Sequence, residues 1–182
     1  MPTDSITSNS IVYSGFPRPV PGDGHLYEKT STTYEKVAGY LLQKGTAAHQ
    51  LKLCASTGAV GTVTPIAVGR IQKYAPGEDT NGKVNTDYAT DAKFIRAMDI
   101  NSPAQVKLWL GPTQTAVVGS FLKQNATTAG ICEVVDLSLT TRAQFLVVGR
   151  ALEAVTCGSA ETKQILVDLA PFVYNERGDN AS

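Results

Sequence analysis

Few side chains in this sequence are of the types that most often carry out chemistry. It has two histidines, His25 and His49, and three cysteines, Cys54, Cys132 and Cys157. Neither histidine has another histidine or a glutamate four residues away, so the spacing that places zinc ligands on one helix face is missing. The cysteines contain no Cys-x-x-Cys pair, and an odd number argues against a disulfide framework. We therefore expect surface histidines, buried free thiols, no metal site and no cofactor.

The sequence motifs of nucleophilic and phosphate-binding sites are missing as well. Gly-x-Ser-x-Gly and Gly-x-x-x-x-Gly-Lys-Ser/Thr do not occur, and no Gly-x-Gly-x-x-Gly follows a predicted strand. Glu133 and Asp136 are three residues apart in a predicted strand, which places their carboxylates on opposite faces. Asn125-Ala126-Thr127 matches the glycosylation sequon, but the chain begins without a secretory signal. We predict no catalytic residues and a protein that is not an enzyme.

The composition limits the partners of the chain. Its 182 residues are 42% hydrophobic and 18% charged, and 16 basic side chains balance 16 acidic ones. This balance lacks the basic footprint of a nucleic-acid-binding protein. No apolar stretch approaches the roughly 20 residues that span a bilayer. We expect no nucleic-acid partner, no membrane partner, and assembly in a cytoplasm.

The residue pattern favours β-structure. Short apolar or alternating runs are separated by turn residues, which is typical of a sandwich or a small barrel. The segment 91–98 fits either a short helix or a strand, and its pattern does not decide between them. The predicted strands cover residues 51–54, 60–63, 66–71, 105–110, 115–123, 130–137, 145–152 and 163–169.

One phrase of the sequence recurs. Segments 66–71 and 146–151 both contain a branched apolar run followed by Gly-Arg. In each case a turn-rich stretch, an alternating strand and a proline follow, and a proline after the last strand predicts its end at 169. Duplication and chance recurrence in a β-rich chain both explain this order. The shared order favours two small β-barrel or β-sandwich modules in tandem, at 34–112 and 113–182.

Residues 1–33 differ from the rest and predict an extended N-terminal arm. Three prolines at 17, 19 and 21 forbid a helix there. Several apolar side chains give the segment more surface to bury against a protein than a typical flexible linker has. Such an arm lies on its own body or on a neighbouring subunit, and the alternative is a frayed terminus. We expect an arm that contacts a partner and whose deletion leaves a folded body. The candidate contact residues are Ile11, Val12, Tyr13, Phe16, Arg70 and Arg150.

Part of the second half is similar to a known family. The segments 145–155, 158–162 and 165–169 resemble tailed-phage head decoration (capsid cement) proteins, in which a Gly-x-Ala-Leu-Glu-Ala phrase precedes a small-residue turn and a strand of alternating aliphatics. The resemblance implies a β-rich homotrimer on the outer surface of an icosahedral capsid. Its partner would be the major capsid protein, its location the virion, and its role stabilisation of the head.

Other classes fit parts of the same pattern. A head fibre base, a tail-tube module or a baseplate module would share the β-content and the lack of chemistry. A small trimeric β-barrel enzyme would need a glycine-rich loop with a metal-binding or water-activating aspartate, which the sequence does not contain. A carbohydrate-binding module would need aromatic platforms, and the chain has a single tryptophan, Trp109.

Overall fold

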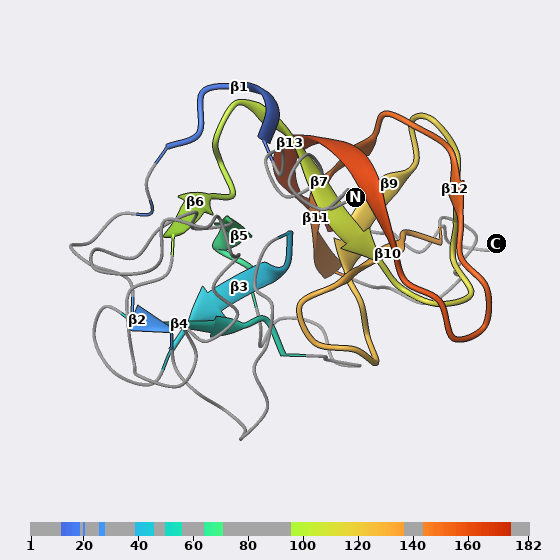
Figure 1. Ribbon diagram of the computed structural model, residues 1–182, viewed down its shortest axis with the longest axis horizontal. Coiled ribbons are helices and arrows are strands. Elements are labelled where there is room, and N and C mark those ends of the chain that lie inside the picture. Colours follow the sequence, from blue (N-terminus) through green and yellow to red (C-terminus); the bar gives the residue numbers. More distant parts are fainter. Residues whose placement is uncertain are drawn as a thin grey trace, which may run out of the picture.

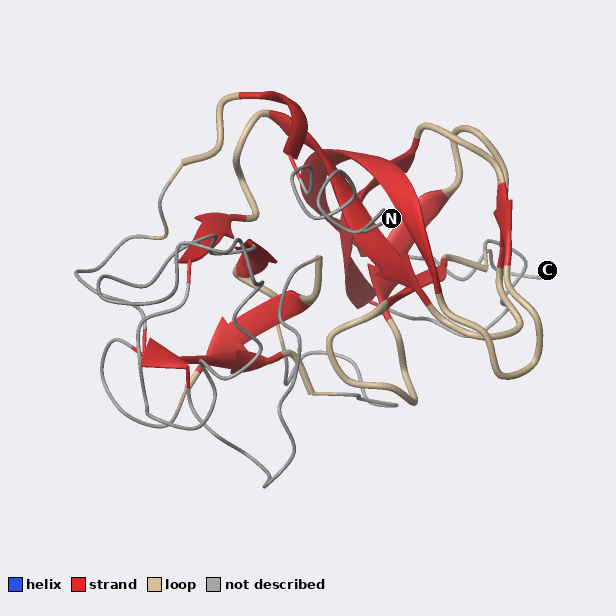
Figure 2. Cartoon of the chain, in the orientation of Figure 1, coloured by secondary structure: helices blue, strands red, loops and turns tan. Residues whose placement is uncertain are grey.

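A computed structural model of the chain describes residues 12–18, 20, 26–27, 39–45, 50–55, 64–70, 96–136 and 144–175 (Figure 1). Every regular element in these ranges is a strand, so the prediction of a mainly β fold is confirmed (Figure 2). The strands are β1 (Val12–Gly15), β2 (Leu26–Tyr27), β3 (Leu41–Lys44), β4 (Gln50–Leu53), β5 (Ala67–Arg70), β6 (Arg96–Asp99), β7 (Ala104–Leu110), β8 (Thr115–Ala116), β9 (Phe121–Gln124), β10 (Cys132–Val134), β11 (Gln144–Ala151), β12 (Val155–Thr156) and β13 (Lys163–Asn175).

The larger sheet closes on itself. β7, β10, β9, β11 and β13 are hydrogen-bonded neighbours in that order, and β13 pairs back with β7 to form a small barrel. β7 alternates between buried and partly buried positions along its whole length, as a strand with one face toward a core must. β1 adds to the first half of β7, beside the position where β10 takes over. The closed circuit leaves few strand edges open.

The smaller sheet has the order β2-β4-β3-β5-β6, and it lies beside the barrel (Figure 1). Side chains alternate along a strand, so residues adjacent in sequence within β3 or β5 point to opposite faces of this sheet. Leu41 and Val68 belong to the main core cluster that also fills the barrel. Leu42 and Ala67, their neighbours in sequence, pack with Val20 in a second cluster on the opposite face. The smaller sheet is therefore buried on both faces.

Backbone hydrogen bonds join the two sheets. The N–H of Leu41 donates to the carbonyl of Gly130 at 2.7 Å, and the N–H of Gly130 donates to the carbonyl of Cys54 at 2.8 Å. The N–H of Trp109 donates to the carbonyl of Gly39 at 3.2 Å. Because the main core cluster spans both sheets and these bonds connect them, the sheets form a single packed unit.

The last strand is longer than the sequence predicts. β13 does not end before Pro171 but runs on to Asn175, so the predicted stop at 169 is wrong. The register with β11 shifts at this point, from Gly149 opposite Leu169 to Val147 opposite Phe172. Two residues of β13 therefore face one of β11, which is a β-bulge, and a proline is tolerated at a bulge because its missing N–H is not needed there.

The structure shows what two other segments form, one predicted as a single strand and one left open between helix and strand. The strand expected over 115–123 is divided into β8 and β9 by a tight turn in which the N–H of Ser120 donates to the carbonyl of Val117. Gly119 has a φ of 92° there, a conformation that glycine adopts without steric cost. The ambiguous segment 91–98 contains the strand β6, and its residues 91–95 lie outside the described ranges.

The recurring Gly-Arg phrases lie in strands with different partners. β11 pairs directly with β13, whereas β5 pairs with β3 and β6. β7, which the predicted boundary assigns to residues 34–112, is part of the barrel built mostly by residues 113–182. The tandem arrangement of two modules is therefore not confirmed, because the sheets do not divide at position 112.

Candidate functional site

Residues 12–18 of the N-terminal arm lie along the chain's own barrel, whereas Leu26–Tyr27 of the arm form β2 of the smaller sheet. Beyond β1, the N–H of Phe16 donates to the carbonyl of Pro103 at 3.1 Å, and the N–H of Arg18 donates to Oγ of Ser102 at 2.9 Å. Gly15 has a φ of 97°, and a Cβ at that position would lie 2.3 Å from the carbonyl oxygen of Pro103. This glycine therefore allows the arm to approach the strand end closely.

Phe16 is the most exposed large apolar residue in the described part of the arm. Its side chain is 81% exposed, although the backbone on both sides of it is hydrogen-bonded to the body. Because the backbone is fixed, the phenyl ring is presented to solvent at a defined position and is available for burial by a partner. Val20, four residues further along, is buried in the second core cluster and anchors the segment.

The structure does not gather the predicted contact residues in one place. Ile11 lies outside the described residues, while Val12 and Tyr13 are in β1, where only their backbone is described. Arg70 is in β5 of the smaller sheet, and its side chain is likewise not described. Arg150 is exposed on β11 of the barrel. The two arginines that follow glycine thus belong to different sheets.

The structure brings together a set of aromatic residues that the sequence analysis missed. On the barrel strands β9, β11 and β13, the ring centroids of Phe121 and Phe172 are 5.4 Å apart, edge to face. Those of Phe145 and Tyr174 are 5.1 Å apart and stacked. We call these four residues the aromatic face. The alternation Phe172-x-Tyr174 is typical of a strand that presents both rings on one face. A strand that ends at 169, as predicted, excludes these two residues from the sheet.

Two cations lie over the aromatic face. Nζ of Lys123 is 4.9 Å from the centroid of Phe145, and the guanidinium carbon of Arg150 is 5.1 Å from that of Phe121. Both distances fall within the range of cation–π attraction.

Val147 is fully buried yet belongs to neither core cluster, and its register partners are Lys123 and Phe172. It is therefore covered from the outside of the barrel by the residues of this face.

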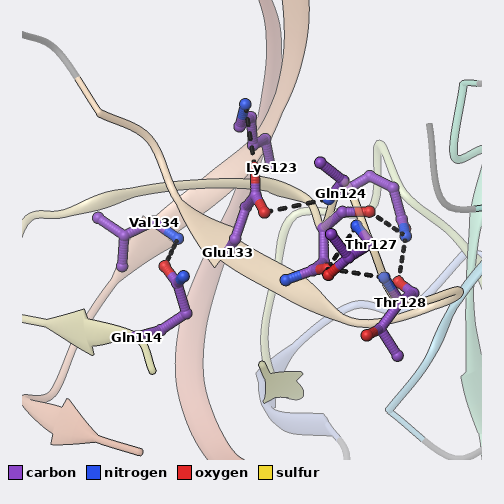
Figure 3. A network of polar contacts seen from close by, with 9 residues as sticks. Gln114, Lys123, Gln124, Thr127, Thr128, Glu133 and Val134 are labelled. Atoms are coloured by element: carbon purple, nitrogen blue, oxygen red, sulfur yellow. Dashed lines mark hydrogen bonds and ion pairs between the residues drawn. The ribbon is translucent and has the colours of Figure 1, made fainter. Parts of the chain in front are cut away.

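A polar network fixes the loop after β9 (Figure 3). Lys123 Nζ and Glu133 Oε1 form an ion pair at 3.1 Å, and Glu133 Oε2 accepts the N–H of Ala126 at 3.0 Å. Gln124 Nε2 donates to the carbonyl of Thr128 at 3.1 Å. These contacts hold the loop that ends at Gly130, the residue bonded to the smaller sheet, so the network positions structure and offers no reactive group.

Asn125 of the sequon has a structural role in the same loop. Its Oδ1 accepts hydrogen bonds from the N–H and Oγ1 of Thr127, both at 2.9 Å, and from the N–H of Thr128 at 2.8 Å. The side chain is only 4% exposed. An asparagine that caps its own loop in this way stabilises the turn and is closed to a modifying enzyme while the chain is folded.

The cysteines are buried free thiols, as predicted. Burial raises the pKa of Cys54 to about 12, and burial together with the nearby Cys54 raises the pKa of Cys132 further. Cys157 lies against the carbonyl of Leu110, 3.7 Å from its Sγ. Because the thiolate is the reactive form, the raised pKa values make Cys54 and Cys132 poor nucleophiles at neutral pH.

The described ranges contain neither a metal-binding cluster nor a membrane-spanning helix. No group of three or more histidine, cysteine, aspartate or glutamate residues in those ranges is arranged to hold a metal ion. Nor does that part of the chain contain a helix long and apolar enough to cross a membrane. Comparison with protein-family models gave no match, and comparison with curated proteins gave no significant one.

Proposed function

We propose that this protein is a capsid decoration protein that binds the outer surface of an icosahedral phage head and stabilises it. Two observations support the proposal: the resemblance of residues 145–169 to decoration proteins, and the presentation of Phe16. The second carries it, because Phe16 is held in solvent by an arm whose backbone is already bonded to the body. Its partner would be the major capsid protein and its location the virion.

The fixed arm suits a contact that is repeated many times. A segment that is ordered before binding loses little conformational entropy when it binds. Equal numbers of acidic and basic residues let copies crowd on one shell without strong net repulsion. Many modest contacts on one particle then act together with high avidity. A homotrimer would link three such contacts, and the proposal requires neither nucleic acid nor a membrane.

The arm is better tested by a point substitution than by truncation. Deleting residues 1–33 would remove β1 from the edge of β7 and Val20 from the second core cluster. Truncation would therefore remove packing from both sheets together with the contact, and a folded body after truncation stays a prediction. Substituting Phe16 alters only an exposed side chain.

We predict that Phe16→Ser weakens binding to decoration-free capsids by about tenfold or more, since burial of a phenylalanine in an interface contributes roughly 1.5 to 3 kcal/mol. Sedimentation of capsids with bound protein measures the change. Val118→Ser is the matched control, because Val118 is 68% exposed but lies in the turn before β9, away from the arm. Equal affinities for the Phe16→Ser variant and the unchanged protein would contradict a contact made through the arm.

A second virion role would differ in copy number. A baseplate or tail-tube component is present in few copies per particle, whereas a decoration protein covers the shell. Quantitative gel analysis of purified particles separates these classes.

A further inference from the structure

The aromatic face has more apolar exposure than the barrel needs for its own stability. Phe172 is 40% exposed, and the other three residues of the face are each partly exposed. The barrel interior is already filled by a continuous cluster of buried aliphatic residues from the same strands. Exposed aromatic residues on paired strands form a rigid surface that can be buried with little loss of side-chain freedom.

Two opposite charges border this face. Arg150 on β11 and Asp168 on β13 are direct register neighbours, so their side chains project from the same side of the barrel wall. The next pair, Ala151 and Val167, is buried in the core, which places Arg150 and Asp168 outside. Both residues are exposed.

The two charges do not pair with each other. The guanidinium of Arg150 lies over Phe121 of β9, and β9 flanks β11 on the side opposite to β13. The register neighbours of Asp168 are Arg150 on β11 and Gln105 on β7. The side-chain oxygen of Gln105 already accepts a hydrogen bond from the hydroxyl of Ser14. Among the described residues, neither Arg150 nor Asp168 takes part in an ion pair.

We propose that copies of this chain associate through the aromatic face, with Arg150 of one copy against Asp168 of the next. The surface is self-complementary: it has an apolar centre and carries one cation and one anion without an ionic partner. A second copy supplies both missing partners at once, whereas a uniformly acidic or basic partner would satisfy only one of them. This inference deepens the proposed function by naming the surface that links decoration subunits, and it rests on that function only for its setting on a shell.

Charge reversal tests the contact with purified protein alone, so its failure is distinct from a failure to bind capsids. We expect Arg150→Asp and Asp168→Arg each to weaken self-association about tenfold or more, because each places like charges together. Combining both substitutions in one chain restores opposite charges across the contact and should restore assembly. Sedimentation equilibrium over a concentration series gives the mass of each species. Lys44→Glu, an exposed charge reversal on β3 of the smaller sheet, is the control and should assemble normally.

Mixing the two single variants determines the order of the assembly. An Arg150→Asp chain and an Asp168→Arg chain complement each other at every contact between unlike chains. A ring of three must contain at least one contact between like chains, which carries like charges. A three-fold ring therefore stays dissociated in the mixture, whereas a two-fold pair forms. A pair in the mixture would uphold the contact and replace the trimer by a dimer.

Phe172→Ser tests the apolar centre independently of the charges, and we expect it to weaken association about tenfold or more. The result that would overturn the proposal is a protein that remains monomeric at every concentration. Unchanged assembly of both charge-reversal variants and of Phe172→Ser would overturn it equally, and so would a double reversal that stays dissociated while circular dichroism shows it folded.

Discussion

Replacing Gly149 by alanine is expected to destabilise the protein by about 2 to 3 kcal/mol, because it overpacks a central strand. A Cβ at this position would lie 2.3 Å from the carbonyl oxygen of Asp168 and 2.8 Å from Cγ1 of Val167. The first of these atoms is backbone in the ladder between β11 and β13, so it cannot move without disturbing the pairing. The midpoint of urea unfolding, followed by tryptophan fluorescence, measures the loss.

Gly158→Ala is the matched control for this substitution. The nearest atom to a Cβ at Gly158 is Oε2 of Glu161 at 3.6 Å, which is an ordinary van der Waals distance. We expect a change within about 0.5 kcal/mol. Equal stability of the two alanine variants would contradict the close approach of β13 to Gly149. It would also contradict the adjoining β-bulge that contains Pro171.

Leu108→Ala is expected to cost about 2 to 5 kcal/mol in the free energy of unfolding, since it leaves a cavity in a closed core. Leu108 is fully buried in β7, opposite Ile165 of β13, and belongs to the cluster shared by the barrel and the smaller sheet. Val118→Ala removes apolar atoms from an exposed turn and should change the stability by about 0.5 kcal/mol or less. A loss under about 1 kcal/mol for Leu108→Ala would show that the barrel is not closed around this residue.

The local features of the fold could be predicted from the sequence. The alternation in 105–110 gives β7 its buried and partly buried faces, and the apolar runs around Gly69 and Gly149 form the strands β5 and β11. The three cysteines are buried because each stands among apolar or small neighbours. These features depend on residues close in the chain, where periodicity and turn chemistry act directly.

The strand partners could not be predicted in the same way. β1 pairs with β7 and β13 pairs with β7 across long sequence separations, and no local pattern encodes such choices. Pro171 indicates a strand end to any local rule, yet the bulge opposite β11 accommodates it. Because the strand was expected to stop there, Phe172 and Tyr174 were not assigned to a sheet surface.

The candidate contact residues show the same division. Phe16 and Arg150 were selected from composition and from the Gly-Arg phrase, and both are exposed. Their surroundings depend on tertiary pairing: Phe16 lies beside Pro103, just before the start of β7, and Arg150 lies over Phe121. The anionic neighbour Asp168 had no sequence signal, because it becomes relevant only through its register with Arg150.

The most direct test of the proposed decoration function is the temperature at which particles release their packaged DNA. Particles without this protein, particles carrying it, and particles incubated with the Phe16→Ser variant are heated in parallel with a DNA-binding dye. We predict release at a higher temperature only when the unchanged protein is bound, because its repeated contacts hold the shell against internal pressure. Equal release temperatures for bare particles and for particles shown to carry the unchanged protein would contradict a stabilising role on the capsid.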